Sequence, residues 1–403
     1  MEDKKDKIKF IQKLAYGLHI YGAPCYRIEA ACTQIAIKLG FNNKSGFFST
    51  PTSMFSTYVN DDLEEQSRLL RVEPASVNLK KLSQVDHIGE QVVNSQLSAS
   101  QAQKKLSEIF VTNDDKKVLK ILSYAIIAAN FTIYLNGNLY DALFALLIGA
   151  VVGIVTSRKK NNNLQYLSEG LAAFLATIFS YSLTLITPNI NPPLITLASL
   201  IVIIPGLNIT ISVSELATNN LTSGTSRLVG AIMVLLKLAF GVYVAREITG
   251  LFNFPQFIET SINHGMLLKI SLLPIAALGL TFSFKAALKD YIWILLIGLV
   301  SVSSSNIVSS HYNVLLGTFT GAFSVTLVSN LFSKYFKRPV LLMLLPGIIF
   351  LVPGSLGFKS IELFFHSDAL LGMELAFQVA KIALALVAGL LFGNVFINPK
   401  RNI

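Results

Sequence analysis

The stretch Leu146-Leu147-Ile148-Gly149 returns later in the chain as Leu295-Leu296-Ile297-Gly298, at an offset of 149 residues. The same offset relates Leu119-Lys120-Ile121 to Leu268-Lys269-Ile270, Ala173-Phe174 to Ala322-Phe323, and Thr177 to Thr326. After a slip of one residue, an offset of 148 relates Pro205-Gly206 to Pro353-Gly354, Gly224 to Gly372, and Gly241 to Gly389. Two similar units built mostly of apolar residues predict a membrane protein with internal symmetry, a plan that many transporters use.

The composition is that of a membrane protein with a polar N-terminal part. Of 403 residues, 52% are hydrophobic and only 14% are charged, whereas soluble proteins carry about 25% charged residues. Residues 1–117 contain 16 basic and 14 acidic side chains, and the remaining residues contain 17 and 9. Because the positive excess falls between apolar runs, we interpret it as inward-facing loops and not as a nucleic-acid-binding patch.

Residues 1–117 predict a cytoplasmic α+β domain that ends in a polar hinge at 113–117. Helical periodicity covers 8–20, 26–39, 79–96 and 99–110, and runs typical of strands cover 47–59 and 67–72. The charged start of the chain does not have the pattern of a signal peptide. Cys25 and Cys32 lie seven residues apart, about 10 Å along a helix, which is too far for a disulfide. We expect neither a metal site nor a cofactor.

Ten apolar segments follow, each near the roughly 20 residues needed to cross a bilayer. They cover 118–135, 139–157, 164–186, 194–212, 226–248, 266–284, 291–309, 313–333, 339–356 and 370–396. Basic residues follow the second, sixth, eighth and tenth segments, at 158–160, 285–289, 334–338 and 400–401. The positive-inside rule therefore predicts that both termini are cytoplasmic, with Arg246 near the outer end of the fifth segment as a mild exception.

Five segments fall in each unit, at 118–250 and 264–398. Because five is odd, the two units must cross the membrane in opposite directions. The sequence thus predicts an all-α polytopic membrane protein with ten transmembrane helices arranged as two inverted five-helix repeats. We expect it in the cytoplasmic (plasma or inner) membrane, where such repeats support alternating access to a central site.

Both units carry a proline-glycine break inside an apolar segment. Pro205-Gly206 interrupts the fourth segment, and Pro353-Gly354 interrupts the ninth. Proline removes a backbone donor and glycine permits unusual dihedral angles, so a break frees backbone groups that a substrate can bind. Either break alone could equally end a helix at the surface, but a matched pair is a strong indication of a transporter site.

Polar residues near these breaks complete the candidate substrate site. The set comprises Pro205, Gly206, Asn208, Thr210, Glu215, Asn306, Pro353, Gly354 and Ser355. Glu215 is the candidate proton-coupling acid, because an intramembrane carboxylate can bind an amino group or carry a proton. A solvated loop glutamate is an equal alternative, and Glu362 stands one residue out of register in the second unit. For any single asparagine or serine, the commoner role is to join helices.

Lys237 and Lys381 lie near the middles of the fifth and tenth segments. A lysine there costs about 2.5 to 3.5 kcal/mol on insertion, so each is expected to face protein or water. We include both as candidate proton-coupling residues, although they are not equivalent in the repeat. Snorkelling toward the interface is the alternative.

In the N-terminal domain, His19, Arg27 and Glu29 form a candidate motif. No metal spacing or nucleophile elbow accompanies these residues, so a structural role is favoured over an enzyme site.

The segment Gly22-Ala23-Pro24-Cys25-Tyr26-Arg27-Ile28-Glu29 resembles the Gly-x-x-x-x-Arg-Val-Glu signature of the threonine/serine exporter family, which includes the fungal pheromone-regulated membrane protein 10-like proteins. Further similar segments follow in the family's order, at Thr50-Pro51-Thr52, 200–206, Thr222-Ser223-Gly224 with Arg227-Leu228, and Val352-Pro353-Gly354-Ser355. The resemblance implies export of L-threonine and L-serine, coupled to the proton motive force. The family usually has an aspartate where Glu215 stands.

The expected function is therefore secondary active export of threonine and serine by proton antiport, without enzymatic activity. The expected partners are the amino acid, protons and the lipid bilayer, with no nucleic acid; the oligomeric state stays open, a homo-oligomer included. Two alternatives remain. One is a membrane-anchored metabolite hydrolase or sensor that uses the N-terminal domain, and the other is a passive channel.

Overall fold

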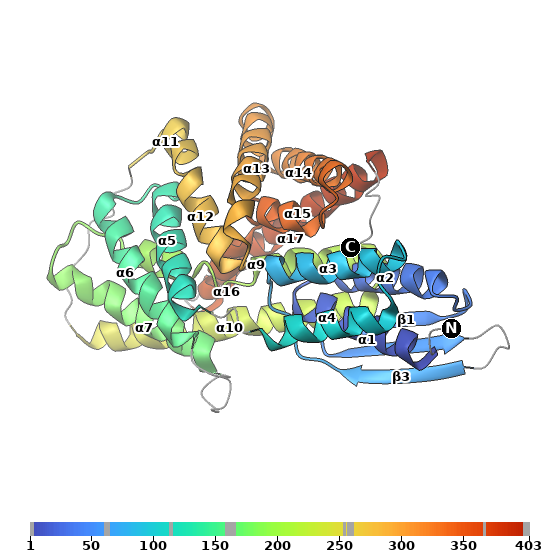
Figure 1. Ribbon diagram of the computed structural model, residues 1–403. Coiled ribbons are helices and arrows are strands. Elements are labelled where there is room, and N and C mark those ends of the chain that lie inside the picture. The colour runs from blue at the N-terminus through green and yellow to red at the C-terminus, as the bar shows by residue number, and fades with distance from the viewer. Residues whose placement is uncertain are drawn as a thin grey trace.

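The computed structural model places an N-terminal domain of helices and one small sheet against a larger unit of apolar helices (Figure 1). It describes residues 4–59, 65–112, 116–157, 167–252, 255, 262–365 and 368–397. The basic loops expected at 158–160 and 400–401, and most of the hinge expected at 113–117, lie outside these residues.

The N-terminal domain contains four helices and one three-stranded sheet. The elements are α1 (Lys4–Ile20), α2 (Cys25–Lys38), β1 (Gly46–Thr50), β2 (Ser53–Val59), β3 (Glu65–Arg71), α3 (Leu79–Val93) and α4 (Ala99–Val111). The sheet is antiparallel in the order β1-β2-β3. The single strand expected at 47–59 was wrong. Pro51 cannot continue the ladder, and the Thr50 hydroxyl accepts hydrogen bonds from the Thr52 and Ser53 amides, which makes a turn.

The turn between α1 and α2 positions the start of α2. Gly22 has φ of +100°, and a Cβ there would come within 3.1 Å of the Val77 Cα, so both the backbone angle and the space favour glycine. Pro24 then occupies the N-cap position of α2, with Cys25 as its first residue. This geometry aims the free amides of the α2 N-terminus toward the membrane helices.

The apolar helices form two series with the same order. The first contains α5 (Lys117–Tyr134), α6 (Leu139–Val155), α7 (Ser168–Ser182), η2 (Leu183–Leu185), α8 (Pro192–Leu200), α9 (Gly206–Ala217) and α10 (Leu221–Leu251). The second contains α11 (Met266–Ser271), α12 (Leu273–Ser283), η3 (Leu288–Asp290), α13 (Tyr291–His311), α14 (Val314–Phe336), α15 (Leu341–Ile349), α16 (Gly354–Phe365) and α17 (Ala369–Phe396).

Fewer than ten of these helices qualify individually as membrane spans. Within the described ranges, seven helical stretches are long and apolar enough, and the pair α15–α16, bent by 45°, makes an eighth if it is one span. Of the remaining expected segments, α6 has only 17 residues, and the fourth is divided into α8 and α9 at the Pro205-Gly206 break. The count of ten spans therefore stays a prediction.

The two series share local geometry at the repeat offset. Helices α9 and α16 both have 12 residues and begin 148 positions apart. Asn136 and Lys285, which lie 149 positions apart, both have positive φ, at 67° and 48°. A Cβ on Gly241 would contact Ala173, and one on Gly389 would contact the equivalent residue Ala322. The same helix pairs therefore approach closely in both series.

The series meet along α5 and α12, which lie side by side (Figure 1). The Asn130 side-chain amide of α5 donates to the Leu272 carbonyl at 2.9 Å, and farther along α12 Gly279 lies against Ile127. Residue numbers thus rise in one helix as they fall in the other, so the two equivalent helices run antiparallel.

The N-terminal domain docks on the second series at the turn after α12. The Leu79 amide at the start of α3 donates to the Phe284 carbonyl at 2.9 Å, and the Lys80 amide donates to the Lys285 carbonyl at 3.3 Å. The long α10 of the first series also reaches the domain (Figure 1). The domain thus contacts both series at one end of the helical unit.

Candidate functional site

The two proline-glycine breaks lie against each other in the structure. A Cβ on Gly206 would come within 3.0 Å of the Gly354 Cα, and a Cβ on Gly354 would come within 3.2 Å of the Gly206 Cα. Both glycines, with Pro205 and Pro353, are buried. Because α9 and α16 each begin at this contact, two helix N-termini converge here, and their dipoles favour a negatively charged group.

Glu215 lies in the last turn of α9 and its side chain is fully buried, with 0% exposure. Arg227 of α10 holds both carboxylate oxygens: its Nε donates to Oε2 at 3.1 Å and its Nη2 donates to Oε1 at 3.2 Å. The Ser223 hydroxyl donates a further hydrogen bond to Oε2 at 2.8 Å. This bidentate, charge-assisted arrangement stabilises a buried carboxylate that would otherwise be very unfavourable.

The N-terminal domain supplies the remaining donor to this carboxylate. The backbone amide of Cys25, the first residue of α2, donates to Glu215 Oε1 at 3.1 Å. The Ser223 hydroxyl lies 3.0 Å from the Cys25 thiol. Burial, reinforced by the negative charge of Glu215, raises the pKa of the Cys25 thiol, so it stays neutral. Glu215 therefore links α9, α10 and the N-terminal domain at one point.

A cavity lies beside α9 between the two series. Its volume is about 20 Å³, which is room for roughly one water molecule. Thr210 lines it, and its hydroxyl has no hydrogen-bond partner within the part of the chain that the structure describes. Pro24 and Tyr26 of the N-terminal domain cover it. The other lining residues are Leu207, Ile211, Ser214, Leu341, Leu344, Leu345, Ile348 and Leu390.

Glu215 lies apart from the glycine contact. It is nine residues beyond Gly206, roughly 13 Å along α9, on the side where the N-terminal domain docks. Thr210 falls between them, so the glycine contact, the cavity and the acid follow one another along a single helix.

His19 is buried near this acid and is expected to be neutral. Its Nε2 lies 3.1 Å from the Glu73 carbonyl. Burial, followed by the positive charge of Arg227, lowers the pKa of His19 to about 4.

Stability should therefore fall as pH drops from 6.5 toward 4. In this window the unfolded chain protonates His19 and the folded chain does not, which removes up to about 3 kcal/mol of stability. We expect the thermal unfolding temperature in detergent to fall further between pH 7.5 and pH 5 for the wild type than for His19→Gln. An equal fall in unfolding temperature for the two proteins would show that His19 does not titrate in this way.

Comparison with known proteins assigns the chain to a family. Residues 9–249 match the family model described as "Putative threonine/serine exporter". Residues 269–396 match a second model, described as "Threonine/Serine exporter, ThrE". The chain belongs to the threonine/serine exporter family.

Two curated relatives of this exporter-family chain come from fungi. Pheromone-regulated membrane protein 10 of Zygosaccharomyces rouxii is 24% identical over 385 residues, which cover 89% of this chain and 37% of the relative. The protein of the same name from Eremothecium gossypii is 25% identical over 376 residues, covering 89% and 49%. This chain thus spans less than half the length of these two relatives. No solved structure matches it.

The structure separates the other candidate residues of this exporter-family chain from Glu215. Lys237 forms an ion pair with Glu169 at 3.7 Å, and Lys381 is exposed on α17. Glu362 forms an ion pair with Arg246 at 2.8 Å. Among the polar residues, Asn208 is exposed, and Asn306 and Ser355 are half-buried. Their roles stay predictions.

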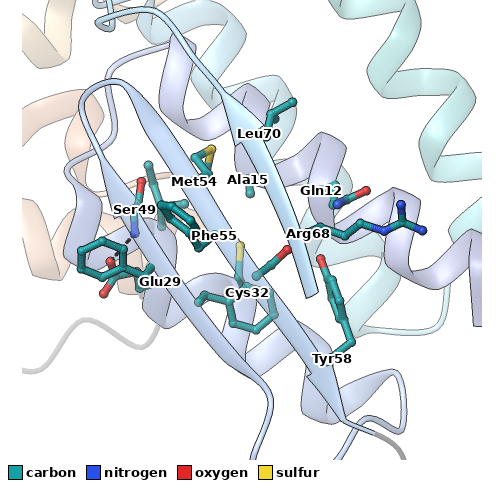
Figure 2. Close-up of a pocket in the computed structure, with 14 residues that line it drawn as sticks. Gln12, Ala15, Glu29, Cys32, Ser49, Met54, Phe55, Tyr58, Arg68 and Leu70 are labelled. Atoms are coloured by element: carbon teal, nitrogen blue, oxygen red, sulfur yellow. Dashed lines mark hydrogen bonds between the residues drawn. The ribbon is translucent and has the colours of Figure 1, made fainter. Parts of the chain in front are cut away.

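The N-terminal motif residues do not form one cluster. Arg27 is buried beside the Tyr26 ring, with 5.7 Å between its guanidinium carbon and the ring centroid. Glu29 instead faces the sheet, where one carboxylate oxygen accepts the Ser49 amide at 2.7 Å (Figure 2). His19 and Glu29 are both close enough to Glu215 to interact with its charge.

Sequence reasoning missed three partners of Glu215: Arg227, Ser223 and the Cys25 amide. Arg227 could have been found, since it is the first basic residue after Glu215 in the chain and a buried carboxylate needs a cation. Neither Ser223 nor the Cys25 amide has a sequence feature that would mark it as a partner of a buried acid.

Proposed function

We propose that this chain is a secondary active transporter that exports threonine and serine from the cytoplasm by proton antiport. One observation carries the proposal: a fully buried glutamate, held by an arginine, lies beside a cavity between two broken helices in a member of an exporter family. Buried acids in membrane segments commonly mark proton and substrate pathways.

The proposed architecture is ten spans in two inverted repeats, with both termini in the cytoplasm. The antiparallel packing of α5 against α12 and the contact between Gly206 and Gly354 support it, because a pseudo-twofold axis between the repeats would bring equivalent elements together in this way. The axis would lie in the membrane plane, as in other transporters with inverted repeats.

In the proposed mechanism, the amino acid binds beside Thr210 after the small cavity there widens through movement of α9. The converging N-termini of α9 and α16 favour its carboxylate, and freed backbone carbonyls favour its ammonium group. Proton binding to Glu215 would neutralise the partner of Arg227 and weaken the link between α9 and α10. Because the ion pair between Glu215 and Arg227 would be weaker when Glu215 is protonated, proton binding and movement of α9 would be coupled.

The N-terminal domain would form part of the inner gate. Pro24 and Tyr26 cover the cavity from the side that we assign to the cytoplasm, and Cys25 binds Glu215. Opening toward the cytoplasm would then require α2 to move away from α9.

Flux of labelled threonine and serine in proteoliposomes tests the proposal. With both amino acids at equal concentrations across the membrane, an imposed pH gradient should drive net movement of either one against its own gradient. Exchange of labelled amino acid without net movement, at a rate that ignores the pH gradient, would indicate a passive channel. No exchange of either labelled amino acid would rule out this substrate class.

A further inference from the structure

The two helices that follow the breaks each carry, in their last turn, a glutamate bound to an arginine. Glu215 is the tenth residue of α9, and Glu362 is the ninth residue of α16. The Arg227 Nε lies 3.1 Å from Glu215 Oε2, and the Arg246 Nη2 lies 2.8 Å from Glu362 Oε1. The two series therefore carry similar ion pairs near the ends of equivalent helices.

Both arginines belong to the long helix α10. They lie 19 residues apart, which is roughly 28 Å along the helix axis. This separation is close to the thickness of the hydrocarbon core, about 30 Å. In the proposed topology, Arg227 is at the cytoplasmic face and Arg246 is at the outer face. Helix α10 thus holds the end of one broken segment at each face of the membrane.

The pair at the outer face joins the two series, whereas the pair at the inner face lies within the first series. Glu215 and both arginines belong to the first series, and Glu362 belongs to the second. At the repeat offset, α17 has Leu375 and Asn394 at the positions equivalent to the two arginines. Because α10 supplies both cations, a break in the outer pair would free α16 of the second series from the first.

Further contacts hold the end of α16 at the outer face. The ring of Phe365, one turn after Glu362, packs on the ring of Tyr243, one turn before Arg246, with 5.6 Å between the ring centroids. Arg246 also donates a hydrogen bond to the Tyr181 hydroxyl of α7. The side chains of Arg246 and Glu362 are 24% and 17% exposed. The outer pair is therefore a local closure that water partly reaches.

The structure is closed at both faces. Pro24 and Tyr26 cover the cavity beside Thr210 from the inner side, and that cavity has room for roughly one water molecule. An amino acid can pass only if the helix ends separate. Alternating access requires that the two faces open in turn, because simultaneous opening would leave a continuous path.

We infer that Arg246 and Glu362 form the outer gate of the transporter, and that the end of α16 leaves α10 when the transport site opens to the outside. The inference rests on the proposed transport function and topology. In this role the pair acts by positioning α16 and does not itself bind the amino acid. Loss of either charge should shift the population toward the outward-open state.

Cysteine labelling tests the outer gate and does not depend on transport. The reporter is Gly357→Cys, which lies on α16 between the break and Glu362. Gly357 is buried, and the nearest neighbour of an added Cβ would be the Leu235 side chain of α10 at 3.7 Å, an ordinary contact. Because this position faces α10, it should become accessible when α16 moves away.

In intact cells, a membrane-impermeant maleimide should label the reporter slowly. Adding Glu362→Gln or Arg246→Gln should raise the initial labelling rate at least about tenfold, since each variant removes a charge-assisted hydrogen bond that holds the gate closed. Adding Glu169→Gln, which breaks a different ion pair of α10, with Lys237, should leave the rate unchanged. Exchange of the two charges, by Arg246→Glu with Glu362→Arg, should bring the rate back toward that of the reporter alone.

Inside-out vesicles separate gating from a general loss of structure. There Glu362→Gln should not raise the labelling rate, because the inner face stays closed by the Glu215 network and the N-terminal domain. The inference is overturned if both glutamine variants label no faster than the reporter alone, if the rise is equal from the two sides, or if the charge exchange labels as fast as Glu362→Gln. Absence of pH-driven flux in the wild type, together with the expected labelling, would instead count against the transport proposal alone.

Discussion

Glu215→Gln should reduce pH-driven efflux of threonine and serine to the level of empty liposomes. Glutamine keeps the size of the side chain and can still accept hydrogen bonds from Cys25 and Arg227, but it cannot exchange a proton. In the proposed mechanism, that exchange couples proton movement to α9. The measurement is labelled flux per folded protein in proteoliposomes, with and without a pH gradient.

The variant also leaves Arg227 without its anion, so loss of folding must be distinguished from loss of coupling. Breaking a buried ion pair costs about 3–5 kcal/mol. Asp290→Asn is a matched control, because Asp290 is equally buried and pairs with Arg338 at 2.5 Å outside the α9 region. We expect that control to keep coupled flux. Undiminished coupled flux in Glu215→Gln would remove Glu215 from the mechanism.

Gly206→Ala should destabilise the protein and strongly reduce transport. The new methyl group would meet the Val352 side chain and come within 3.0 Å of the Gly354 Cα. Because the Gly354 Cα belongs to the backbone and cannot move aside, the two broken helices must separate. This should lower the stability of the protein by about 1–3 kcal/mol. Thermal unfolding and flux, measured on the same preparations, should both show the loss.

Two other glycines calibrate this effect. At Gly354, an added Cβ would lie 3.1 Å from the Ile204 side chain and 3.2 Å from the Gly206 Cα. Both distances are longer than the shortest contacts at Gly206, so Gly354→Ala should be milder. At Gly230 of α10, an added Cβ would meet no described atom within 4 Å beyond its own helical turns, and alanine there should be neutral or stabilise by up to about 1 kcal/mol. An unfolding temperature for Gly206→Ala equal to that of Gly230→Ala would show that the contact between the breaks is not tight.

Much of the helical architecture could be predicted because matched apolar runs must bury matched faces. The breaks at Pro205 and Pro353 could also be predicted, because proline and glycine act through local backbone chemistry. Helix lengths were less predictable. Hydropathy does not separate one span from two short helices, and the 194–212 segment became α8 and α9. The strand expected at 47–59 failed at Pro51 through the same local chemistry.

The candidate site was only partly predictable. Glu215 stood out because a carboxylate is costly in an apolar segment. Its contact with the N-terminal domain could not be foreseen, because Cys25 lies 190 residues away and contributes a backbone amide, a group that every residue except proline carries. The ion pairs of Lys237 and Glu362 also depend on which helix faces meet, and the sequence does not encode that locally.

Opposite insertion of the two series is the feature on which the proposed transport mechanism rests. Tyr140 and Lys289 lie 149 positions apart in the repeat; Tyr140 is 58% exposed and Lys289 is also exposed. Cys25 and Cys32, the two native cysteines, are both buried. In intact cells, a membrane-impermeant maleimide should label Tyr140→Cys directly, but Lys289→Cys only after the membrane is permeabilised. Labelling of both positions from the same side would contradict the inverted repeat.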